Sequence, residues 1–324
     1  MGLMTSLRPF ISLADSLTKN SLKGFNMDKL AMIKKAEQLV EKIDDLPTIP
    51  VVATQVLQLL DQPDVRIEDV ADLMLSDQVM TARVMKMINS PVYKPGNEIT
   101  SLKRALVYLG LKHIREVALT TSFIKAFEAD SGAFEISTFW EHSFGVGMVS
   151  KILAEKIGYA DLEKAYIAGI IHDLGVVFLS NYMRDEFKLI LGAILNKPIK
   201  LVDAEAQLLG TTHCEIGLCM ARKWNFPEVY CEVIAYHHSP SDATIDPVLC
   251  AIVNLSDLFC SVRELNYGGR EWVSFNLFEE KAWQILKNES PSLGKLDIER
   301  FCYELDDAIP DVKELVDSIF NSKE

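Results

Sequence analysis

The spacing of apolar residues along the chain is helical almost throughout. In residues 28–43, "DKLAMIKKAEQLVEKI", apolar side chains recur at Leu30, Ile33 and Val40, roughly at the intervals of one helix face. Pro47 ends this segment because proline cannot continue a helix. No stretch sustains the strict alternation that indicates a strand. We therefore predict an all-α fold.

Turn-forming residues divide the rest of the chain into further helices. A break is expected at Gly110, between "LKRALVYLG" and "LKHIREVALTTSFIKAF". The second half contains two long helical patterns, "STFWEHSFGVGMVSKILAEKIGY" and "LEKAYIAGIIHDLGVVFLSNYM". The predicted organisation is two-lobed: an N-terminal arm at 1–27, a first helical lobe at 28–133, a second at 134–264 and C-terminal helices at 265–324.

Composition and charge narrow the class of protein. The chain has 324 residues, enough for two lobes, and a formal net charge of −13. A charge of this sign repels phosphates, so we expect neither nucleic acid nor a membrane surface as partner. No apolar run reaches the roughly 18 residues of a membrane span, and Arg8 and Asp15 interrupt any signal sequence. The six cysteines form no CxxC pair and predict buried thiols in a reducing, cytoplasmic setting.

Residues that commonly bind metals are concentrated in the second lobe. Five predicted helices carry them, and the set is His142, His172, Asp173, His213, His237, His238 and Asp257. His113 stands apart in the first lobe and is expected to be a surface or structural residue.

The surroundings of Asp173 are the strongest single indication of a site. The run 165–179, "AYIAGIIHDLGVVFL", holds one carboxylate and one imidazole among apolar or small residues, which indicates a buried helix. A buried carboxylate must be paired, hydrogen-bonded, protonated or bound to metal. Backbone amides with His172 as companion would satisfy Asp173, and so would a metal ion. The other histidines favour the metal, and imidazole with carboxylate suits Fe, Mn, Zn or Ni.

Other notable residues are expected to be structural. Trp140 and Trp224 are predicted core aromatics, and Glu141 is predicted to face solvent. The methionine-rich stretch is predicted to be adaptable packing in the core, at Met74, Met80, Met85 and Met87.

With these residues in place, the chain resembles the HDOD proteins, a bacterial regulatory branch of the HD-domain superfamily. The resemblance covers roughly residues 45–257 and includes "LPTIPVVATQVLQLL", "FWEHS", "AGIIHDLG", "HCEIGLCMARKWNFP" and "VIAYHHSP". It implies an all-α fold with an HD-type core and a role in signal transduction. By position, all seven His/Asp residues match the ligand positions of the related HD-GYP phosphodiesterases, which implies a binuclear site for divalent transition metals.

Three departures from the HD-GYP pattern concern catalysis. Val176 stands where those enzymes carry the lysine of "HDIGK", so a charge that would hold a phosphate is missing. The paired histidines lead into "HHSPSDATID" and not a "GYP" stretch, and Thr138 stands where a further carboxylate ligand would fall.

Three functions follow as alternatives. The first is a regulatory module that binds a protein partner or a nucleotide, with any metal structural or sensory. The second is a metal-dependent phosphohydrolase, in which two ions activate a bridging water. The third is redox or oxygen sensing at a di-iron centre.

Overall fold

A computed structural model describes ten stretches of the chain, namely residues 29–43, 51–60, 62–93, 95–126, 136–196, 199–263, 265–266, 276–290, 293–294 and 296–320. Every regular element within these stretches is a helix, which confirms the all-α prediction. No helix among them is both long and apolar enough to span a bilayer. The predicted arm at 1–27 lies outside the described residues.

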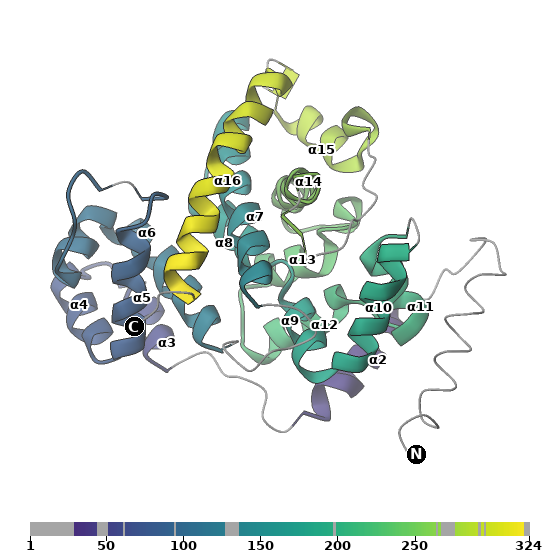
Figure 1. Ribbon diagram of the computed structural model, residues 1–324, viewed down its shortest axis with the longest axis horizontal. Helices are drawn as coiled ribbons and strands as arrows, with labels where there is room; N and C mark the ends of the chain where they lie inside the picture. Colours follow the sequence, from purple (N-terminus) through teal and green to yellow (C-terminus); the bar gives the residue numbers. More distant parts are fainter. Residues whose placement is uncertain are drawn as a thin grey trace.

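The first lobe is a group of four helices at one end of the molecule (Figure 1). They are α3 (Val51–Leu60), α4 (Ile67–Leu75), α5 (Gln78–Ile88) and α6 (Leu102–Ala126). The Asp77 carboxylate caps α5 by accepting from the backbone N–H groups of Val79 and Met80. Gly110 interrupts α6 with φ 71° and ψ 162°, so the expected break is confirmed. Three of the four methionines are fully buried here, and Met85 is partly buried.

The second lobe contains a larger set of helices. They are α7 (Ile136–Ile157), α8 (Leu162–Ile171), α9 (Leu174–Tyr182), α10 (Arg184–Asn196), α11 (Leu201–Leu209), α12 (His213–Lys223), α13 (Glu228–Tyr236) and α14 (Pro247–Ser261), with a 3-10 turn η1 (Pro240–Asp242) after α13. The helix α8 packs along α7, and α9 packs along α12.

Glycines allow both of these helix pairs to approach closely. A Cβ on Gly169 would lie 2.7 Å from the Cα of Gly147, so α8 and α7 touch backbone to backbone. A Cβ on Gly175 would lie 2.0 Å from the carbonyl oxygen of His213, at the start of α12. Any larger residue would push these helices apart, because atoms cannot approach to that distance.

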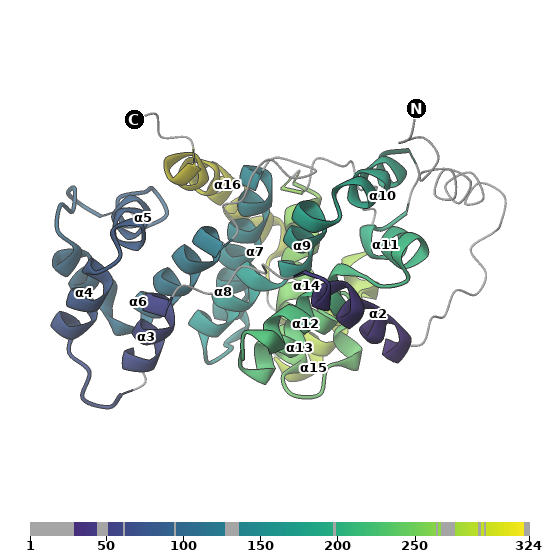
Figure 2. The same ribbon diagram turned by 90° about the horizontal axis from the view of Figure 1, so that it is seen from below.

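The remaining helices join the two lobes or cover the second. The helix α16 (Ile298–Phe320) contacts both α7 and α5, and the Phe320 ring stacks on buried Trp140 with centroids 6.3 Å apart. The shorter elements η2 (Leu277–Glu279) and α15 (Lys281–Glu289) pack near α14. Figure 2 shows the two lobes side by side, with α16 lying across one face.

The helix α2 (Lys29–Glu41) belongs to the predicted first lobe at 28–133, but in the structure it lies against the second lobe. Among the described elements its main contacts are with α12 of the second lobe. Lys29 pairs with the buried carboxylate of Glu215, and the Thr211 hydroxyl donates to the Met32 carbonyl at 3.0 Å. These tertiary contacts are invisible to a periodicity argument, which locates the helix but not its partner.

Candidate metal centre

The structure brings all seven predicted residues together in the second lobe. His142 lies on α7 and Asp257 on α14, while the other five lie at helix ends. His172 and Asp173 form the junction of α8 and α9, His213 begins α12, and His237 and His238 follow α13.

The His172-Asp173 junction corrects the single long helix that the sequence suggested. The helical pattern from 162 to 182 is broken at Asp173, where φ is −100° and ψ is 25°. The apolar pattern continues through the break because both halves are buried all round, so periodicity could not reveal it. The break places Asp173 at the N-terminus of α9, beside the start of α12.

Asp173 is the centre of the arrangement, because its two oxygens face different pairs of histidines. Oδ2 lies 3.2 Å from Nε2 of His172 and 3.5 Å from Nε2 of His142. Oδ1 lies 3.3 Å from Nε2 of His213 and 3.3 Å from Nε2 of His237. The carboxylate therefore lies between two imidazole pairs, as a bridging ligand does.

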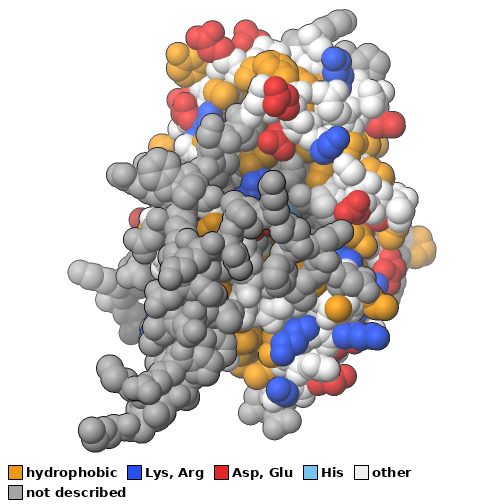
Figure 3. Space-filling model, turned by 90° about the vertical axis from the view of Figure 1, so that its right-hand side faces the viewer, with side chains coloured by type: hydrophobic (Ala, Val, Ile, Leu, Met, Phe, Trp, Pro, Cys, Tyr) orange, Lys and Arg blue, Asp and Glu red, His pale blue; other side chains and the backbone are white. Residues whose placement is uncertain are grey.

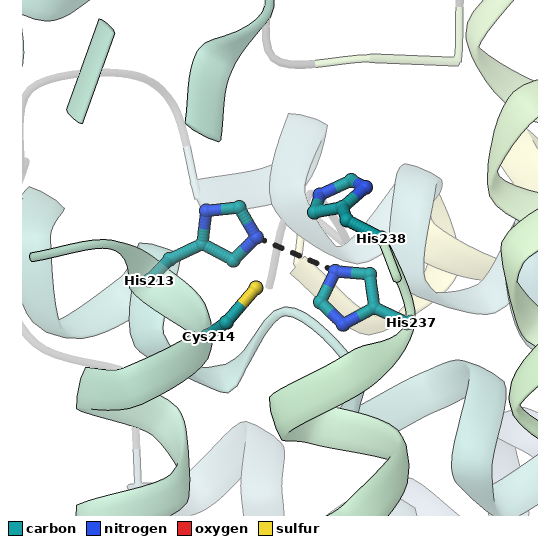
Figure 4. A group of neighbouring side chains, drawn as sticks. All are labelled: His213, Cys214, His237 and His238. Atoms are coloured by element: carbon teal, nitrogen blue, oxygen red, sulfur yellow. Dashed lines mark hydrogen bonds between the residues drawn. The ribbon is translucent and has the colours of Figure 1, made fainter. Parts of the chain in front are cut away.

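Asp257 and His238 complete the two sides of the site. Asp257 Oδ1 lies 3.4 Å from Nε2 of His142, and its Oδ2 lies 3.8 Å from Nδ1 of His238. Figure 4 shows His238 beside His213 and His237, with the latter two rings turned toward each other. His238 is the most exposed histidine of the set, whereas the other four are buried.

Hydrogen bonds at Nδ1 determine which nitrogen each buried histidine directs into the site. Nδ1 of His142 lies 2.7 Å from the Leu265 carbonyl, and Nδ1 of His172 lies 2.7 Å from that of Gly169. Nδ1 of His237 lies 3.1 Å from the carbonyl of Ile234. A carbonyl only accepts, so each Nδ1 carries a proton, and in its neutral form each ring presents an Nε2 lone pair.

The fourth buried histidine is held by a carboxylate that the sequence analysis missed. Glu205 on α11 is fully buried, and its Oε2 accepts from Nδ1 of His213 at 2.7 Å and from the His213 backbone N–H at 2.9 Å. A carboxylate behind a histidine is a common support for a metal ligand. The sequence gives little indication of Glu205, which is one glutamate in "LVDAEAQLLG", eight residues before His213.

This pattern of protonation leaves lone pairs facing one another. Nε2 of His142 and Nε2 of His172 are 3.3 Å apart, and Nε2 of His213 and Nε2 of His237 are 3.4 Å apart. Two unprotonated nitrogens at that distance repel unless a proton or a cation lies between them. The donor set therefore fits a metal ion on each side of Asp173.

The pKa values of Asp173 and several of the surrounding histidines are shifted by burial and by one another. Burial would raise the pKa of Asp173, but His172 and His213 hold it well below its usual range. Burial lowers the pKa of His172, and for His238, whose side chain is partly exposed, desolvation against the centre and the neighbouring His237 lower the pKa well below its usual value. For His142 and His213 burial acts the same way, but nearby anionic groups outweigh it and raise the pKa, Asp173 and Asp257 for His142 and Cys214 and Glu205 for His213. An ionised carboxylate surrounded by imidazoles fits positive charge in the centre, carried by protons or by a metal cation.

The remaining candidates lie outside the centre. Nδ1 of His113 lies 2.8 Å from the Leu109 carbonyl within α6, as expected for a structural residue. Trp140 is buried, as predicted, and Trp224 is partly buried. Glu141 is half-buried and not fully solvent-facing, and burial beside α16 raises its pKa. All six cysteines are free thiols, and four of them are buried.

Two of the positions noted for their departure from HD-GYP enzymes can be located. Val176 is fully buried on the first turn of α9. Thr138 is half-buried on α7, one turn before His142. Neither offers a charged group to the centre.

Comparisons with known proteins agree with this fold. The chain is 33% identical to an HDOD domain protein of unknown function from Geobacter sulfurreducens, covering 90% of this chain and 99% of that one with a TM-score of 0.79. A signal transduction protein from Marinobacter aquaeolei shares the fold at 21% identity and a TM-score of 0.71, covering 91% of this chain and 67% of that one. A protein from Shewanella amazonensis described as a metal-dependent phosphohydrolase shares it at 17% identity and a TM-score of 0.59, covering 88% and 97%.

Among curated sequences the match is partial. An uncharacterised protein of Treponema pallidum is 27% identical over 209 residues, which is 64% of this chain and 40% of that protein. The chain therefore spans less than half the length of this relative. The HDOD domain model matches residues 46–240, well over half of the chain, and the chain belongs to the HDOD domain family.

Proposed function

We propose that the second lobe binds two divalent transition-metal ions, one on each side of Asp173. The observation that carries this is the convergence of four histidine Nε2 atoms on the two oxygens of one buried carboxylate. The first ion would be held by His142, His172 and Asp257, and the second by His213, His237 and His238. Asp173 would bridge them.

The ligand chemistry restricts the metal. Imidazole nitrogens with carboxylate oxygens suit Fe, Mn, Ni or Zn better than Mg or Ca, which prefer oxygen ligands throughout. When bound, two such ions can polarise a phosphoryl oxygen and acidify a water. The residues of the chain supply the positions: Glu205 and three backbone carbonyls fix the orientation of the four buried rings.

We further propose that the protein acts as a regulatory HDOD module, which binds a protein partner or a nucleotide and does not turn over phosphodiesters efficiently. Val176 supports this, because a buried apolar side chain stands where a phosphate-holding lysine is found in HD-GYP enzymes. The signal transduction protein with the same fold is consistent with such a role.

Hydrolysis is the second candidate, and one observation favours it. Six potential ligands are retained around the carboxylate of Asp173, and a protein with the same fold is described as a metal-dependent phosphohydrolase. Sensing of oxygen or redox state at a di-iron centre stays a prediction, which ultraviolet-visible spectra under air and under reductant would check.

The test has two stages. The protein, expressed in medium replete with Fe and Mn, is analysed for metal by elemental analysis, and two equivalents per chain are expected. Metal-loaded protein is then assayed with bis(p-nitrophenyl) phosphate, and no turnover above background is expected. Asp173→Ala should lose the metal, whereas His113→Ala, outside the centre, should retain it.

Each result separates the alternatives. Absence of metal from the loaded protein contradicts the metal centre. Turnover by the wild type and by His113→Ala, lost in Asp173→Ala, contradicts the regulatory proposal and supports the phosphohydrolase.

A further inference from the structure

A cysteine lies next to the second group of histidines, where the resemblance to known families predicts no ligand. Cys214 follows His213 on α12 and is buried. Its Sγ and one nitrogen each of His213, His237 and His238 all lie within 4.8 Å of one another. Figure 4 shows the sulfur in the space between the His213 and His237 rings, below His238.

The start of α12 fixes the position of this side chain. The Thr212 hydroxyl accepts from the Cys214 backbone N–H at 3.2 Å, and the Glu215 carboxylate accepts from the Thr212 backbone N–H at 3.0 Å. Glu215 is itself paired with Lys29 of α2, so contacts on both sides hold this turn. The thiol is thereby held on the side of α12 that faces the histidines.

Resting on the proposed metal centre, we propose that Cys214 is a thiolate ligand of the ion held by His213, His237 and His238. The Sγ–H bond breaks as the sulfur–metal bond forms, and the proton leaves to solvent, so no oxidant or reductant takes part. With the bridging Asp173 the ion would have five ligands, and typical Zn–S and Zn–N bonds of about 2.3 and 2.0 Å would place neighbouring ligand atoms roughly 3–3.7 Å apart. Atoms already within 4.8 Å reach that spacing by side-chain movements of about 1 Å.

The proposal makes the two metal positions chemically different. The side of His142 and Asp257 offers nitrogen and oxygen only, whereas the side of Cys214 offers sulfur in addition to nitrogen and an oxygen of Asp173. Sulfur selects Zn or Fe over Mn, so the two positions should prefer different ions. A thiolate also occupies a coordination position that a reactive water would otherwise take, which is consistent with a regulatory centre.

The competing explanation is a thiol that only neighbours the imidazoles. Cys250 on α14 is a suitable control, because it is also buried but lies in an apolar cluster of the second lobe. Serine has nearly the shape of cysteine but does not replace its sulfur as a soft ligand, so Cys214→Ser and Cys250→Ser form a matched pair.

The experiment loads the full chain with Co²⁺, whose bonds to thiolate absorb strongly in the near ultraviolet. Wild type and Cys250→Ser should show this band at two equivalents of Co²⁺. Cys214→Ser should lose the band, and Zn²⁺ affinity at one of the two positions should fall about 10–100-fold. X-ray absorption of the Zn²⁺-loaded wild type should show one sulfur neighbour, a readout that needs no variant.

Two equivalents of Co²⁺ bound without a thiolate band in the wild type would overturn the Cys214 proposal and leave the metal centre standing. No binding of Co²⁺ or Zn²⁺ by the wild type would overturn both.

Discussion

The two lobes are built from similar helices but differ in what lies at their centres. The first lobe packs apolar side chains such as Met74, Val84 and Met87 against one another, all fully buried. At the centre of the second lobe, His172 and Glu205 are just as completely buried. Helical periodicity therefore describes both lobes equally well, although the second lobe buries a cluster of imidazoles and carboxylates within its apolar core.

This difference determines what each lobe depends on. Burial of apolar surface is the main stabilisation of the first lobe, and its buried Arg83 and Glu116 have partners in Thr121 and Lys151. In the second lobe each buried charge or lone pair costs several kcal/mol unless it is compensated. Its stability should therefore depend on what occupies the centre. On the face shown in Figure 3, the described Lys and Arg side chains lie among Asp and Glu side chains, and several of them gather near its lower end.

Removal of metal should give the largest difference in stability between the two lobes. Ligand present at 1,000 times its Kd stabilises a folded state by about 4 kcal/mol, so chelation should cost the second lobe about that much per ion. Hydrogen exchange should accelerate at amides of α9 and α12 and stay unchanged in α4 and α5. As a control, Met74→Ala should destabilise the first lobe by about 3 kcal/mol and leave the metal content intact. Equal acceleration in both lobes would contradict the comparison.

A substitution that forces α9 away from α12 should have the next largest effect on stability. In Gly175→Ala the added Cβ meets the His213 carbonyl at 2.0 Å, so the helices must move apart. We expect a loss of about 3 kcal/mol in the free energy of unfolding together with loss of metal.

A second glycine provides the control for that substitution. Gly192 lies on α10, and apart from its chain neighbours and the backbone of its own helix no atom of the described residues comes within 4 Å of the position that an added Cβ would take. Gly192→Ala should therefore stabilise the chain by about 0.5–1 kcal/mol, because alanine restricts the unfolded chain and favours the helix. Chemical denaturation and elemental analysis measure both variants. Gly175→Ala with wild-type stability and metal content would show that the close approach is not needed.

Some features of the molecule could be predicted from the sequence and others could not. The helices and the break at Gly110 followed from apolar spacing and turn residues, because these signals are local. The convergence of His142, His213 and Asp257 was predicted from residue type and from family resemblance, and the structure does bring them together. Their role as ligands stays a prediction.

Other features depend on tertiary contacts that leave little trace in one sequence. The junction at Asp173 lies inside a continuously apolar pattern, and α2 packs on a helix far away along the chain. Glu205 was missed because a single glutamate on an amphipathic helix usually faces solvent. Only the fold shows that it faces inward, against His213.

Glu205 offers a finer test of the second lobe. In Glu205→Gln the side chain keeps its size but loses the charge that holds the Nδ1 proton of His213. Loss of such a supporting carboxylate typically weakens metal binding about 10–100-fold, and we expect this at the His213 side only. Zn²⁺ titration against a competing chelator measures it. Asp203→Asn on the same helix is the control. Equal Zn²⁺ affinity in the wild type and both variants would show that Glu205 does not support metal binding.

The smallest expected effect is a change of stability with pH, caused by a carboxyl group at the boundary between the lobes. Glu163 on α8 faces Arg115 of α6, with Oε1 3.7 Å from Nε. Burial, and then the charge of Glu116, raise the pKa of Glu163 from 4.5 to about 7. The folded protein therefore keeps a proton between these values that the unfolded chain has already released. Stability from this group is complete below pH 4.5 and is lost as the pH rises through 7.

Glu163→Gln should remove that loss, because an amide does not titrate. Denaturation of chelated protein at pH 5 and pH 8 should show the wild type weakening by on the order of 1 kcal/mol more than the variant, since the side chain remains partly solvated. Chelation keeps metal binding from contributing to the slope. Glu155→Gln, at an exposed position of α7, should behave as the wild type. Identical slopes in wild type and Glu163→Gln would mean that Glu163 does not make stability at the lobe boundary depend on pH.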